Sequence, residues 1–430
     1  MRFEPAARLG GELSPPPDKS ISHRAALVAG MCERPVRISN YLRAADTDST
    51  LAAVASLGAD VTTDDGEVTV RGVGLRGARG DAAIDVGNAG TLLRMLPGWL
   101  AGQPRGRWTL DGDASIRRRP VDRVAAPLRL MGARVQCRDE RLPPLTVEGS
   151  ALRGIDYELP VASAQVKSCV LLAGLLAEGA TTVREREPTR DHTELTLARA
   201  GARVTVERDG PLAPATVTVE PAAALDLDEL AVPADFSSAA FFLAAAAIVP
   251  GAEVTVQAVG VNPTRTGLLT VMREMGADIE IANERSVSRE AVADVTLRHS
   301  PLRATRIERG AVPLLIDELP LVALLGAFAE GTTAVSGAEE LRHKESDRIA
   351  TVVAGMGALG ARIEAQPDGF AVEGGGGLRG GAIDAAGDHR LAMLGAVAGV
   401  ASREGVEVRG FEAVEISYPG FAEDLRSLGA

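Results

Sequence analysis

The residues best suited to chemistry lie at the starts of apolar helices, and the first group is the segment DKSISHR, which begins at Asp18. It follows three consecutive prolines, and Asp18 or Ser20 can cap the helix that runs through Ala25–Ala29. Lys19 and Arg24 add two cations at the positive end of that helix, where a cation is unfavourable unless an anion joins it. The segment therefore indicates an anion site, with a solvated helix start as the alternative.

Two further loops have compositions that suit anionic groups. The segment GNAGT, Gly87–Thr91, precedes an apolar helix and lets backbone N–H groups approach a ligand closely, although an ordinary turn fits it equally well. Arg117, Arg118 and Arg119 are adjacent cations in an acidic protein, which indicates either an anion site or an exposed charged stretch. The GNAGT loop has neither the lysine of a P-loop nor the glycine spacing of a dinucleotide site.

Neutral hydrogen-bonding groups occur at two other helix starts. The segment SAQVKS, Ser163–Ser168, opens a helix expected over residues 166–177, and its Ser and Gln side chains suit hydroxyl or phosphate groups. In the segment TRDHTE, Asp191 and Glu194 have the spacing of a capping box. Arg190 lies just outside that helix, where its side chain can bind an anion.

The second half of the chain contains an acid pair and a basic segment. Asp317 and Glu318 precede an apolar helix expected over residues 319–328, where they can serve as caps. In the segment LRHKESDR, Lys344 and Arg348 are four residues apart, which predicts that they share one helix face. A salt-bridged surface helix is the alternative to a binding site here.

The overall composition limits the partners of the protein. The 430 residues include 46 basic and 58 acidic side chains, and this net charge of −12 disfavours a nucleic-acid binder. The longest apolar stretch, Phe236–Val249, is too short to span a bilayer. Three cysteines have no metal spacing and five histidines show no paired spacing, so we expect no metal site. We also expect no cofactor. We therefore expect a cytoplasmic protein with neither a membrane nor a nucleic acid as partner.

Lysine is unusually rare in this chain. Only Lys19, Lys167 and Lys344 are lysines, whereas the other 43 basic residues are arginines. A retained lysine indicates a position that needs a compact ammonium group, with chance as the alternative. Lys19 and Lys344 fall in the segments described above, while no role is predicted for Lys167.

A repeated pattern organises the whole chain. Six segments pair an amphipathic helix with a glycine, and in the first five of them a strand then starts with Val or Ile, which predicts that each glycine ends a helix in the left-handed conformation. Each unit of about 70 residues cannot bury its own apolar face, so the units must pack together. The repeated glycines are Gly58, Gly132, Gly201, Gly276, Gly360 and Gly429.

Six units are too many for one core, which stops growing near 250–300 residues, so two bodies of three units each are expected. Prolines mark crossovers near residues 15–18 and 232–235. One domain then spans residues 18–233, and the other combines residues 1–17 with 234–430. If the two bodies face each other, the polar loops converge on a cleft suited to two small anions, at least one of them phosphorylated.

These motifs, taken in order, resemble the family of 5-enolpyruvylshikimate-3-phosphate synthases, which are enolpyruvyl transferases. The resemblance covers nearly the whole chain, and the combination of DKSISHR, GNAGT and KESDR is highly specific. It implies an α/β fold of two domains, each built from three repeated βαβαββ-type units as an inside-out α/β barrel. The supporting motifs are also GDASIRRRP, ASAQVKS, TRDHTE, NPTRTG, IDELP and DHR.

The resemblance also implies the reaction and the residues that perform it. The family transfers the enolpyruvyl group of phosphoenolpyruvate to the 5-hydroxyl of shikimate 3-phosphate and releases phosphate through a tetrahedral intermediate. Asp317 is then the base toward the hydroxyl, and Lys19 and Glu345 handle the proton of the methylene carbon. The implied ligands of shikimate 3-phosphate are Lys19, Ser20, Arg24, Ser163, Ala164, Gln165, Arg190, Asp317 and Lys344. Those of phosphoenolpyruvate are Lys19, Asn88, Gly90, Arg119, Gln165, Arg348 and Arg390.

Departures from the family pattern qualify these expectations. Ile416 stands where many members carry a lysine, so one phosphate contact is replaced or absent, and Glu340 stands where others carry a substrate-contacting Asn. Gly90 is retained at a position where larger residues accompany glyphosate tolerance, which implies that glyphosate inhibits this protein. The alternatives are an enolpyruvyl transferase that acts on a UDP-amino sugar, which normally has a Cys in the loop matching 112–120, and a non-catalytic binding protein of the same fold. We expect a monomer.

Overall fold

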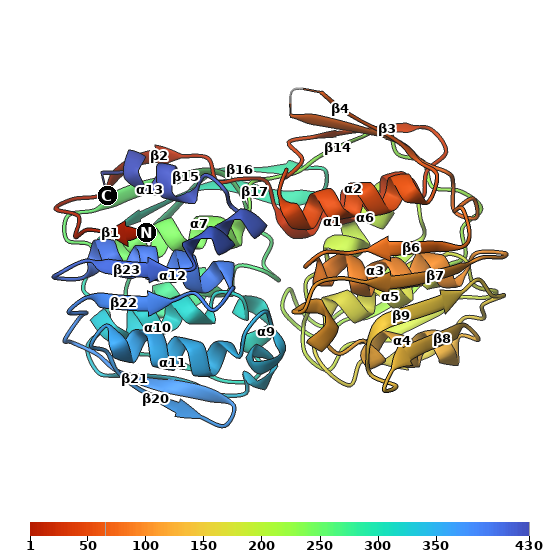
Figure 1. Cartoon of the computed structure of the whole chain (residues 1–430). Helices are drawn as coiled ribbons and strands as arrows, with labels where there is room; N and C mark the ends of the chain where they lie inside the picture. Colours follow the sequence, from red (N-terminus) through yellow and green to blue (C-terminus); the bar gives the residue numbers. More distant parts are fainter. Residues whose placement is uncertain (65, 430) are drawn as a thin grey trace. The chain divides into compact units, whose positions relative to one another are not determined.

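The computed structural model describes residues 1–64 and 66–429, and the chain divides into two compact units (Figure 1). Unit 2 consists of Pro17–Val232 together with the short segment Val287–Glu290. Unit 1 consists of Met1–Pro16, Pro233–Ser286 and the chain from Ala291 onward. Both main crossings fall at prolines, whose fixed backbone dihedral suits a rigid connection.

The segment Val287–Glu290 differs from the expected division, which assigned it to the same domain as its neighbours in sequence. The backbone N–H of Ala231 donates to Ser288 Oγ at 2.9 Å, and His192 Nδ1 lies 2.8 Å from Glu290 Oε1. These contacts are long-range in sequence, so the local pattern contained no signal for them.

Unit 2 contains three four-stranded sheets of one design among its described residues. In each sheet the first two strands are parallel, and the remaining two join antiparallel as a hairpin. The sheets are β14(Glu229–Ala231)-β3(Pro35–Ser39)-β5(Glu67–Arg71)-β4(Asp60–Asp64), β6(Ala82–Asp85)-β7(Arg107–Asp111)-β9(Leu142–Glu148)-β8(Arg134–Arg138) and β10(Asp156–Glu158)-β11(Thr181–Arg184)-β13(Thr216–Val219)-β12(Val204–Glu207). The helices are α1(Lys19–Gly30), α2(Ala45–Ser56), α3(Gly90–Ala101), α4(Asp122–Leu130), α5(Ala164–Gly174) and α6(His192–Arg199), with a 3-10 turn η1(Ile116–Arg118).

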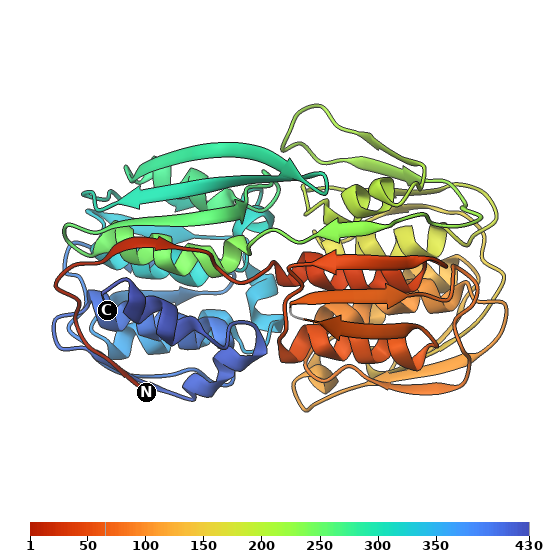
Figure 2. The same ribbon diagram turned by 90° about the horizontal axis from the view of Figure 1, so that it is seen from above.

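Unit 1 repeats the design with two four-stranded sheets and one three-stranded sheet among its described residues. The N-terminal strand β2 pairs in parallel with β15, as Figure 2 shows where the red and green strands run side by side. The sheets are β2(Gly10–Leu13)-β15(Glu253–Gly260)-β17(Glu290–Arg298)-β16(Asp278–Val287), β18(Arg306–Ile307)-β19(Thr332–Val335)-β21(Gly369–Glu373)-β20(Arg362–Gln366) and β1(Arg2–Phe3)-β23(Val406–Arg409)-β22(Gly381–Asp384). The helices are α7(Phe236–Ile248), α8(Gly267–Glu274), α9(Val312–Leu315), α10(Leu319–Phe328), α11(Arg348–Ala358), α12(His389–Ala401) and α13(Phe421–Ser427), with 3-10 turns η2(Glu339–His343) and η3(Phe411–Ile416).

The six sheets confirm the predicted sixfold α/β repeat. Each predicted glycine follows an outer helix in a left-handed conformation, with φ between 82° at Gly201 and 107° at Gly58. The first βαβαββ unit in each of the two bodies is completed by a strand from elsewhere in the chain, because β14 joins the sheet of β3 in unit 2 and β2 joins the sheet of β15 in unit 1. The N-terminal strands therefore belong with the second half of the chain, as expected.

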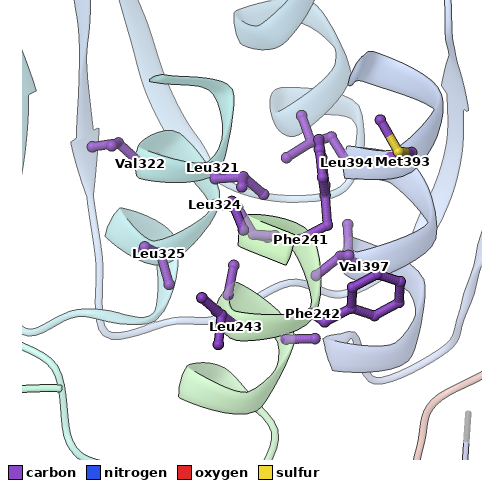
Figure 3. Close-up of a cluster of buried hydrophobic side chains, with 14 of the residues drawn as sticks. Phe241, Phe242, Leu243, Leu321, Val322, Leu324, Leu325, Met393, Leu394 and Val397 are labelled. Atoms are coloured by element: carbon purple, nitrogen blue, oxygen red, sulfur yellow. The ribbon is translucent and has the colours of Figure 1, made fainter. Parts of the chain in front are cut away.

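Each unit has its own hydrophobic core, built on helices that are apolar all round. Every residue of α7 is buried, and its Phe241 and Phe242 pack with α10 and α12 (Figure 3). Polar residues in these cores are concentrated at the helix starts, which is where the predicted functional residues lie. Of the helices in the described part of the chain, none combines the length and apolar character needed to cross a bilayer.

Candidate functional site

In unit 2 the start of α1 presents the predicted cations. The Asp18 side chain accepts a hydrogen bond from the backbone N–H of Ile21 at 2.8 Å, so Asp18 is the cap. Lys19 Nζ lies 3.0 Å from Asp46 Oδ2 in the first turn of α2. Burial, together with the charges of Lys19 and Arg24, holds the pKa of His23 well below its usual value. His23 is therefore neutral, and the positive charge at this helix start belongs to Lys19 and Arg24.

Arg24 is buried among hydroxyl groups of other helices. Its Nε donates to Thr193 Oγ1 at 2.7 Å, and its Nη2 donates to Ser168 Oγ at 3.1 Å. Burial lowers the pKa of Arg24 to about 10, with the positive charge of Arg190 contributing in the same direction and Glu194 opposing it. Arg24 and Arg190 are thus two cations close enough to repel one another, which an anion bound beside them would relieve.

The GNAGT loop and Arg119 form a second group in unit 2. Arg119 Nη2 donates to Asn88 Oδ1 at 2.8 Å, and Asn88 Nδ2 donates to Asp113 Oδ2 at 2.6 Å. A Cβ placed on Gly90 would lie 2.6 Å from Arg119 Nη1, so the glycine leaves the space that the guanidinium uses. The loop therefore fixes Arg119 at the start of α3.

The three adjacent arginines do not act as one site. Arg117 is exposed and its Nη2 lies 2.8 Å from Asp111 Oδ2, while Arg118 is also exposed. Only Arg119 is buried. The alternative of an exposed charged stretch thus holds for the first two.

The start of α5 lies against the start of α3. Ser163 Oγ caps α5 by accepting from the backbone N–H of Val166 at 3.4 Å. Gln165 Oε1 accepts from Arg94 Nη1 at 2.7 Å, and Gln165 Nε2 donates to Thr91 Oγ1 at 3.1 Å. These hydrogen bonds connect the start of α5 with Thr91 of the GNAGT loop and with α3.

The remaining predicted ligands of unit 2 lie at the same helix starts. Ser20 is half-buried in the first turn of α1, Ala164 is the first residue of α5, and Arg190 is half-buried just before α6. The helix predicted over 166–177 spans Ala164–Gly174 instead, because the Ser163 cap starts it two residues earlier.

The predicted capping box of α6 is wrong. Asp191 makes no side-chain hydrogen bond to the helix start, and its carboxylate lies 3.3 Å from Arg208 Nη2. Glu194 points instead to the buried ammonium of Lys167, with its Oε1 2.6 Å from Nζ. The buried ammonium of Lys167 needs a carboxylate partner, whereas water can satisfy the backbone N–H groups at the start of α6. The Glu194 carboxylate therefore pairs with Lys167 and does not cap the helix.

In unit 1 the predicted residues gather around Asp317, directly before α10. Its carboxylate oxygens lie 3.3 Å from Arg348 Nη1, 3.5 Å from Lys344 Nζ and 3.7 Å from Arg390 Nη2. Three cations around one carboxylate favour its ionised form, which is the form that can accept a proton. Arg348 and Arg390 also contact other carboxylates, namely Glu345, Asp388 and Glu318, so the cluster is a network of opposite charges.

Arg348 is the most buried of these cations, with its side chain 1% exposed. Its Nη2 lies 2.6 Å from Glu345 Oε2, and its Nε lies 2.7 Å from Asp388 Oδ2. Burial alone would lower the pKa of Arg348, but Asp388, Glu345 and Asp317 outweigh it and raise that pKa. Arg348 therefore stays charged while it holds Glu345 and Asp317 in one group.

The prediction that Lys344 and Arg348 share a helix face is wrong. Lys344 is extended, with φ −85° and ψ −155°, and α11 begins only at Arg348. Asp347 starts that helix because its side chain accepts from the backbone N–H of Ala350 at 3.1 Å. The two cations nevertheless meet, because both reach Asp317.

Several polar partners of the site were not predicted as site residues. Asp46, Arg94 and Asp113 carried no local signal, because each meets its partner only through the fold. Asp388 and Glu318 were visible as acids at the starts of apolar helices. Glu318 accepts a short hydrogen bond from Ser237 Oγ, and its Oε1 lies 3.8 Å from Arg390 Nη1.

No three His, Cys, Asp or Glu side chains within residues 1–64 and 66–429 gather as a metal site would require.

Ile416, which replaces the expected C-terminal lysine, is half-buried at the end of η3.

Comparison with known proteins gives one consistent family. The family model described as EPSP synthase (3-phosphoshikimate 1-carboxyvinyltransferase) matches residues 3–425. A 3-phosphoshikimate 1-carboxyvinyltransferase of Methylococcus capsulatus is 47% identical over 428 residues, which cover 99% of this chain and 96% of that protein. One from Thermus thermophilus is 48% identical over 438 residues, covering 100% of this chain and 99% of that protein.

Solved structures agree with the sequence relatives. The EPSP synthase of Acinetobacter baumannii superposes with a TM-score of 0.86 at 40% identity, covering 100% of this chain and 98% of that one. The enolpyruvyl transferase NikO of Streptomyces tendae has a TM-score of 0.79 at 19% identity, with coverage of 100% and 97%, so this likeness concerns the fold alone.

Proposed function

Because the chain belongs to the EPSP synthase (3-phosphoshikimate 1-carboxyvinyltransferase) family, we propose that its two cation-rich clusters bind shikimate 3-phosphate and phosphoenolpyruvate and join them. The protein is a 3-phosphoshikimate 1-carboxyvinyltransferase of the shikimate pathway, which serves aromatic amino-acid biosynthesis. The enolpyruvyl group passes to the 5-hydroxyl, and phosphate leaves.

The observation that carries the residue assignment is the Asp317 carboxylate among Lys344, Arg348 and Arg390. An ionised carboxylate can take the proton of the 5-hydroxyl as its oxygen attacks C2 of phosphoenolpyruvate. Lys344, Arg348 and Arg390 offer N–H donors that can pair with the phosphate and carboxylate groups of the two substrates. General-base catalysis of this kind is typically worth about 10²–10⁴-fold in rate.

The proton steps at the methylene carbon are assigned to Lys19 and Glu345. In the addition, Lys19 gives a proton to the methylene carbon, and the tetrahedral intermediate forms with a methyl group. In the elimination, Glu345 takes a proton from that methyl group, the double bond re-forms, and the C–O bond to phosphate breaks. Lys19 is 3.0 Å from Asp46 and Glu345 is 2.6 Å from Arg348, so both groups are held by an opposite charge.

The other ligands divide between the substrates by chemistry. For shikimate 3-phosphate the proposed ligands offer cations to the phosphate and small polar groups to the ring hydroxyls. For phosphoenolpyruvate they are mainly cations, which would also stabilise the phosphate as it leaves. The shikimate 3-phosphate ligands are Lys19, Ser20, Arg24, Ser163, Ala164, Gln165, Arg190, Asp317 and Lys344, and the phosphoenolpyruvate ligands are Lys19, Asn88, Gly90, Arg119, Gln165, Arg348 and Arg390.

Substitution of Asp317 tests this assignment. Asp317→Asn keeps the shape of the side chain but removes the base, so turnover should fall by about 10²–10⁴-fold. Phosphate release and thermal unfolding would be measured together, with Asp156→Asn, at an exposed ion pair, as the control. Turnover within a factor of about three of the parent would remove Asp317 from the mechanism.

The alternatives lack a supporting feature in this chain. The loop 112–120 reads GDASIRRRP, without the Cys expected of the UDP-amino-sugar enzymes. A non-catalytic binding protein would not need two carboxylates, Glu345 and Asp317, held by the same Arg348 guanidinium.

We also propose that the protein is a monomer, that it lies in the cytoplasm and that glyphosate inhibits it. Among the described residues only five large apolar side chains are well exposed, which offers little for a stable dimer interface. The three cysteines are unpaired, as is usual in a reducing compartment. Light scattering should give the monomer mass of 44.6 kDa, and a doubled mass would contradict this.

A further inference from the structure

Lys167, the lysine without a predicted role, is buried between two carboxylates. Its side chain is 1% exposed, and its Nζ lies 2.7 Å from Glu185 Oε1 and 2.6 Å from Glu194 Oε1. The side chains of these acids are only 2% and 3% exposed. One ammonium thus joins three elements, namely α5, the end of β11 and α6.

The same elements carry proposed ligands of shikimate 3-phosphate. Lys167 lies two residues after Gln165 in the first turns of α5. Glu185 also accepts hydrogen bonds from Thr189 Oγ1 at 2.5 Å and from the backbone N–H of Ala215 at 3.0 Å. The segment that carries Arg190 is therefore held to Lys167 on both sides, through Glu185 before it and Glu194 after it.

The network extends to α1 through hydroxyl groups. Ser168 Oγ, one residue after Lys167, lies 2.6 Å from Thr193 Oγ1, one residue before Glu194. Both hydroxyls accept hydrogen bonds from Arg24, at 3.1 Å and 2.7 Å. The position of the Arg24 guanidinium therefore depends on how α5 and α6 lie relative to each other, which the ion pairs of Lys167 fix.

Charge balance explains why an ammonium is needed. Burial lowers the pKa of Lys167, but Glu194 and Glu185 outweigh it, so that pKa is raised above its usual value. Burial raises the pKa of Glu194, and Lys167 offsets this only in part. Without the ammonium, two buried carboxylates would lose their counter-charge and separate or take up water.

A guanidinium would fit this place poorly. A guanidinium spreads its N–H donors over three nitrogens in one plane, whereas the two carboxylates both approach the single Nζ of Lys167. The chain uses arginine at 43 of 46 basic positions, so a lysine here follows from the geometry of the site.

We propose that Lys167 is a positioning residue for shikimate 3-phosphate: its ammonium clamps α5 to the segment 185–194 and so sets Ser163, Gln165 and Arg190 relative to Arg24. The proposal rests on the ligand assignment given above. The lysine itself touches no substrate.

Titration of the protein with shikimate 3-phosphate alone tests the proposal. Lys167→Met should raise the dissociation constant about tenfold or more, since a small displacement of several ligands is enough for such a loss. The KM for phosphoenolpyruvate should rise less, because Gln165 is the one proposed ligand of that substrate that α5 carries. Lys167→Arg should not restore the affinity, because a guanidinium cannot reproduce the ion pairs that Nζ makes with Glu185 and Glu194.

A matched control separates positioning from stability. Leu145→Ala opens a cavity in the core of unit 2, on β9 and away from α1, α5 and α6. It should lower the melting temperature while leaving the dissociation constant of shikimate 3-phosphate unchanged. If Lys167→Met does not yield folded protein, Glu185→Gln carries the test, because it keeps the Lys167–Glu194 pair and should weaken binding by about three- to tenfold.

The outcomes are distinguishable. If the parent protein does not bind shikimate 3-phosphate, the ligand assignment fails. If the parent binds it and Lys167→Met, or Glu185→Gln in its place, binds equally well, the positioning role of Lys167 is overturned. The role is also overturned if Leu145→Ala weakens binding as much as Lys167→Met does.

Discussion

Gly90 shows how a residue without a side chain contributes to the site. The guanidinium of Arg119 occupies the space that a Cβ on Gly90 would enter, at 2.6 Å. Gly90→Ala should therefore displace Arg119 and raise the KM for phosphoenolpyruvate several-fold. The concentration of glyphosate needed for half inhibition should rise with it.

The kinetics of the second substrate provide the control for this change. Arg119 is not among the proposed ligands of shikimate 3-phosphate. The KM for shikimate 3-phosphate should therefore stay within a factor of about two of the parent value. An equal rise in both KM values would mean that Gly90→Ala distorts the whole loop, and an unchanged KM for phosphoenolpyruvate would remove Arg119 from its site.

At this scale the sequence identified cations but not their partners. Lys19 and Arg24 were visible because cations at helix starts are unusual, and Arg348 because it lies four residues after Lys344. Their contacts, such as Asp46 and Thr193, come from distant parts of the chain, and only the fold brings them together. The capping box of Asp191 and Glu194 was wrong for the same reason, because Lys167 lies on another helix.

Among the secondary-structure elements, the repeated helix–glycine turn can be tested by replacing its glycine with alanine and comparing the result with the same replacement inside a helix. Gly201 follows α6 with φ 82°, and a Cβ there would meet nothing within 4 Å, so the cost of Gly201→Ala is purely conformational. We expect a loss of about 1 kcal/mol in the free energy of unfolding.

Gly357 is the matched control, because it lies inside α11 and a Cβ there also meets open space. Gly357→Ala should stabilise by up to about 1 kcal/mol, since alanine favours helix. Urea denaturation of both variants measures the two signs. A stabilising Gly201→Ala would contradict the left-handed turn.

The hairpin of β16 and β17 has a pH-dependent support at Asp294. The backbone N–H of Ala258, followed by the Asn283 side chain, holds the pKa of Asp294 below its usual value of 3.8. A lowered carboxyl pKa contributes stability above pH 3.8 that is lost as the pH falls through the folded value. Asp294→Asn should therefore be less stable than the parent at pH 7.

The difference in unfolding free energy should shrink as the pH falls below 3.8, and urea titrations across this range measure it. The same titrations of Glu284→Gln, at an exposed position of β16, are the control for replacing a carboxylate on this hairpin. If the difference in unfolding free energy between Asp294→Asn and the parent stays constant with pH, the charge of Asp294 does not contribute to stability.

Most element types followed from apolar periodicity, whereas several boundaries depended on caps. The helix at Leu319–Phe328 agrees with its predicted range. The helix at Arg348 starts later than predicted because Asp347 caps it, and the one at Ala164 starts earlier because Ser163 does. A cap depends on one hydrogen bond, which periodicity does not detect.

For the molecule as a whole, the number of repeats and the exchange of N-terminal strands followed from the sequence. Six glycine-terminated helices required six units, and the proline-marked crossings required β2 to join the second half. The place of Val287–Glu290 in unit 2 could not be foreseen, because it rests on Ser288 and Glu290 bonding to residues far away in sequence.

The loops before the apolar helices are proposed to perform enolpyruvyl transfer to shikimate 3-phosphate. Phosphate release by the purified parent protein, measured with shikimate 3-phosphate plus phosphoenolpyruvate and with each substrate alone, tests it most directly. We predict release only when both substrates are present, in an amount equal to the enolpyruvyl product formed. Release only with a UDP-amino sugar in place of shikimate 3-phosphate, or none with either acceptor, would contradict the account.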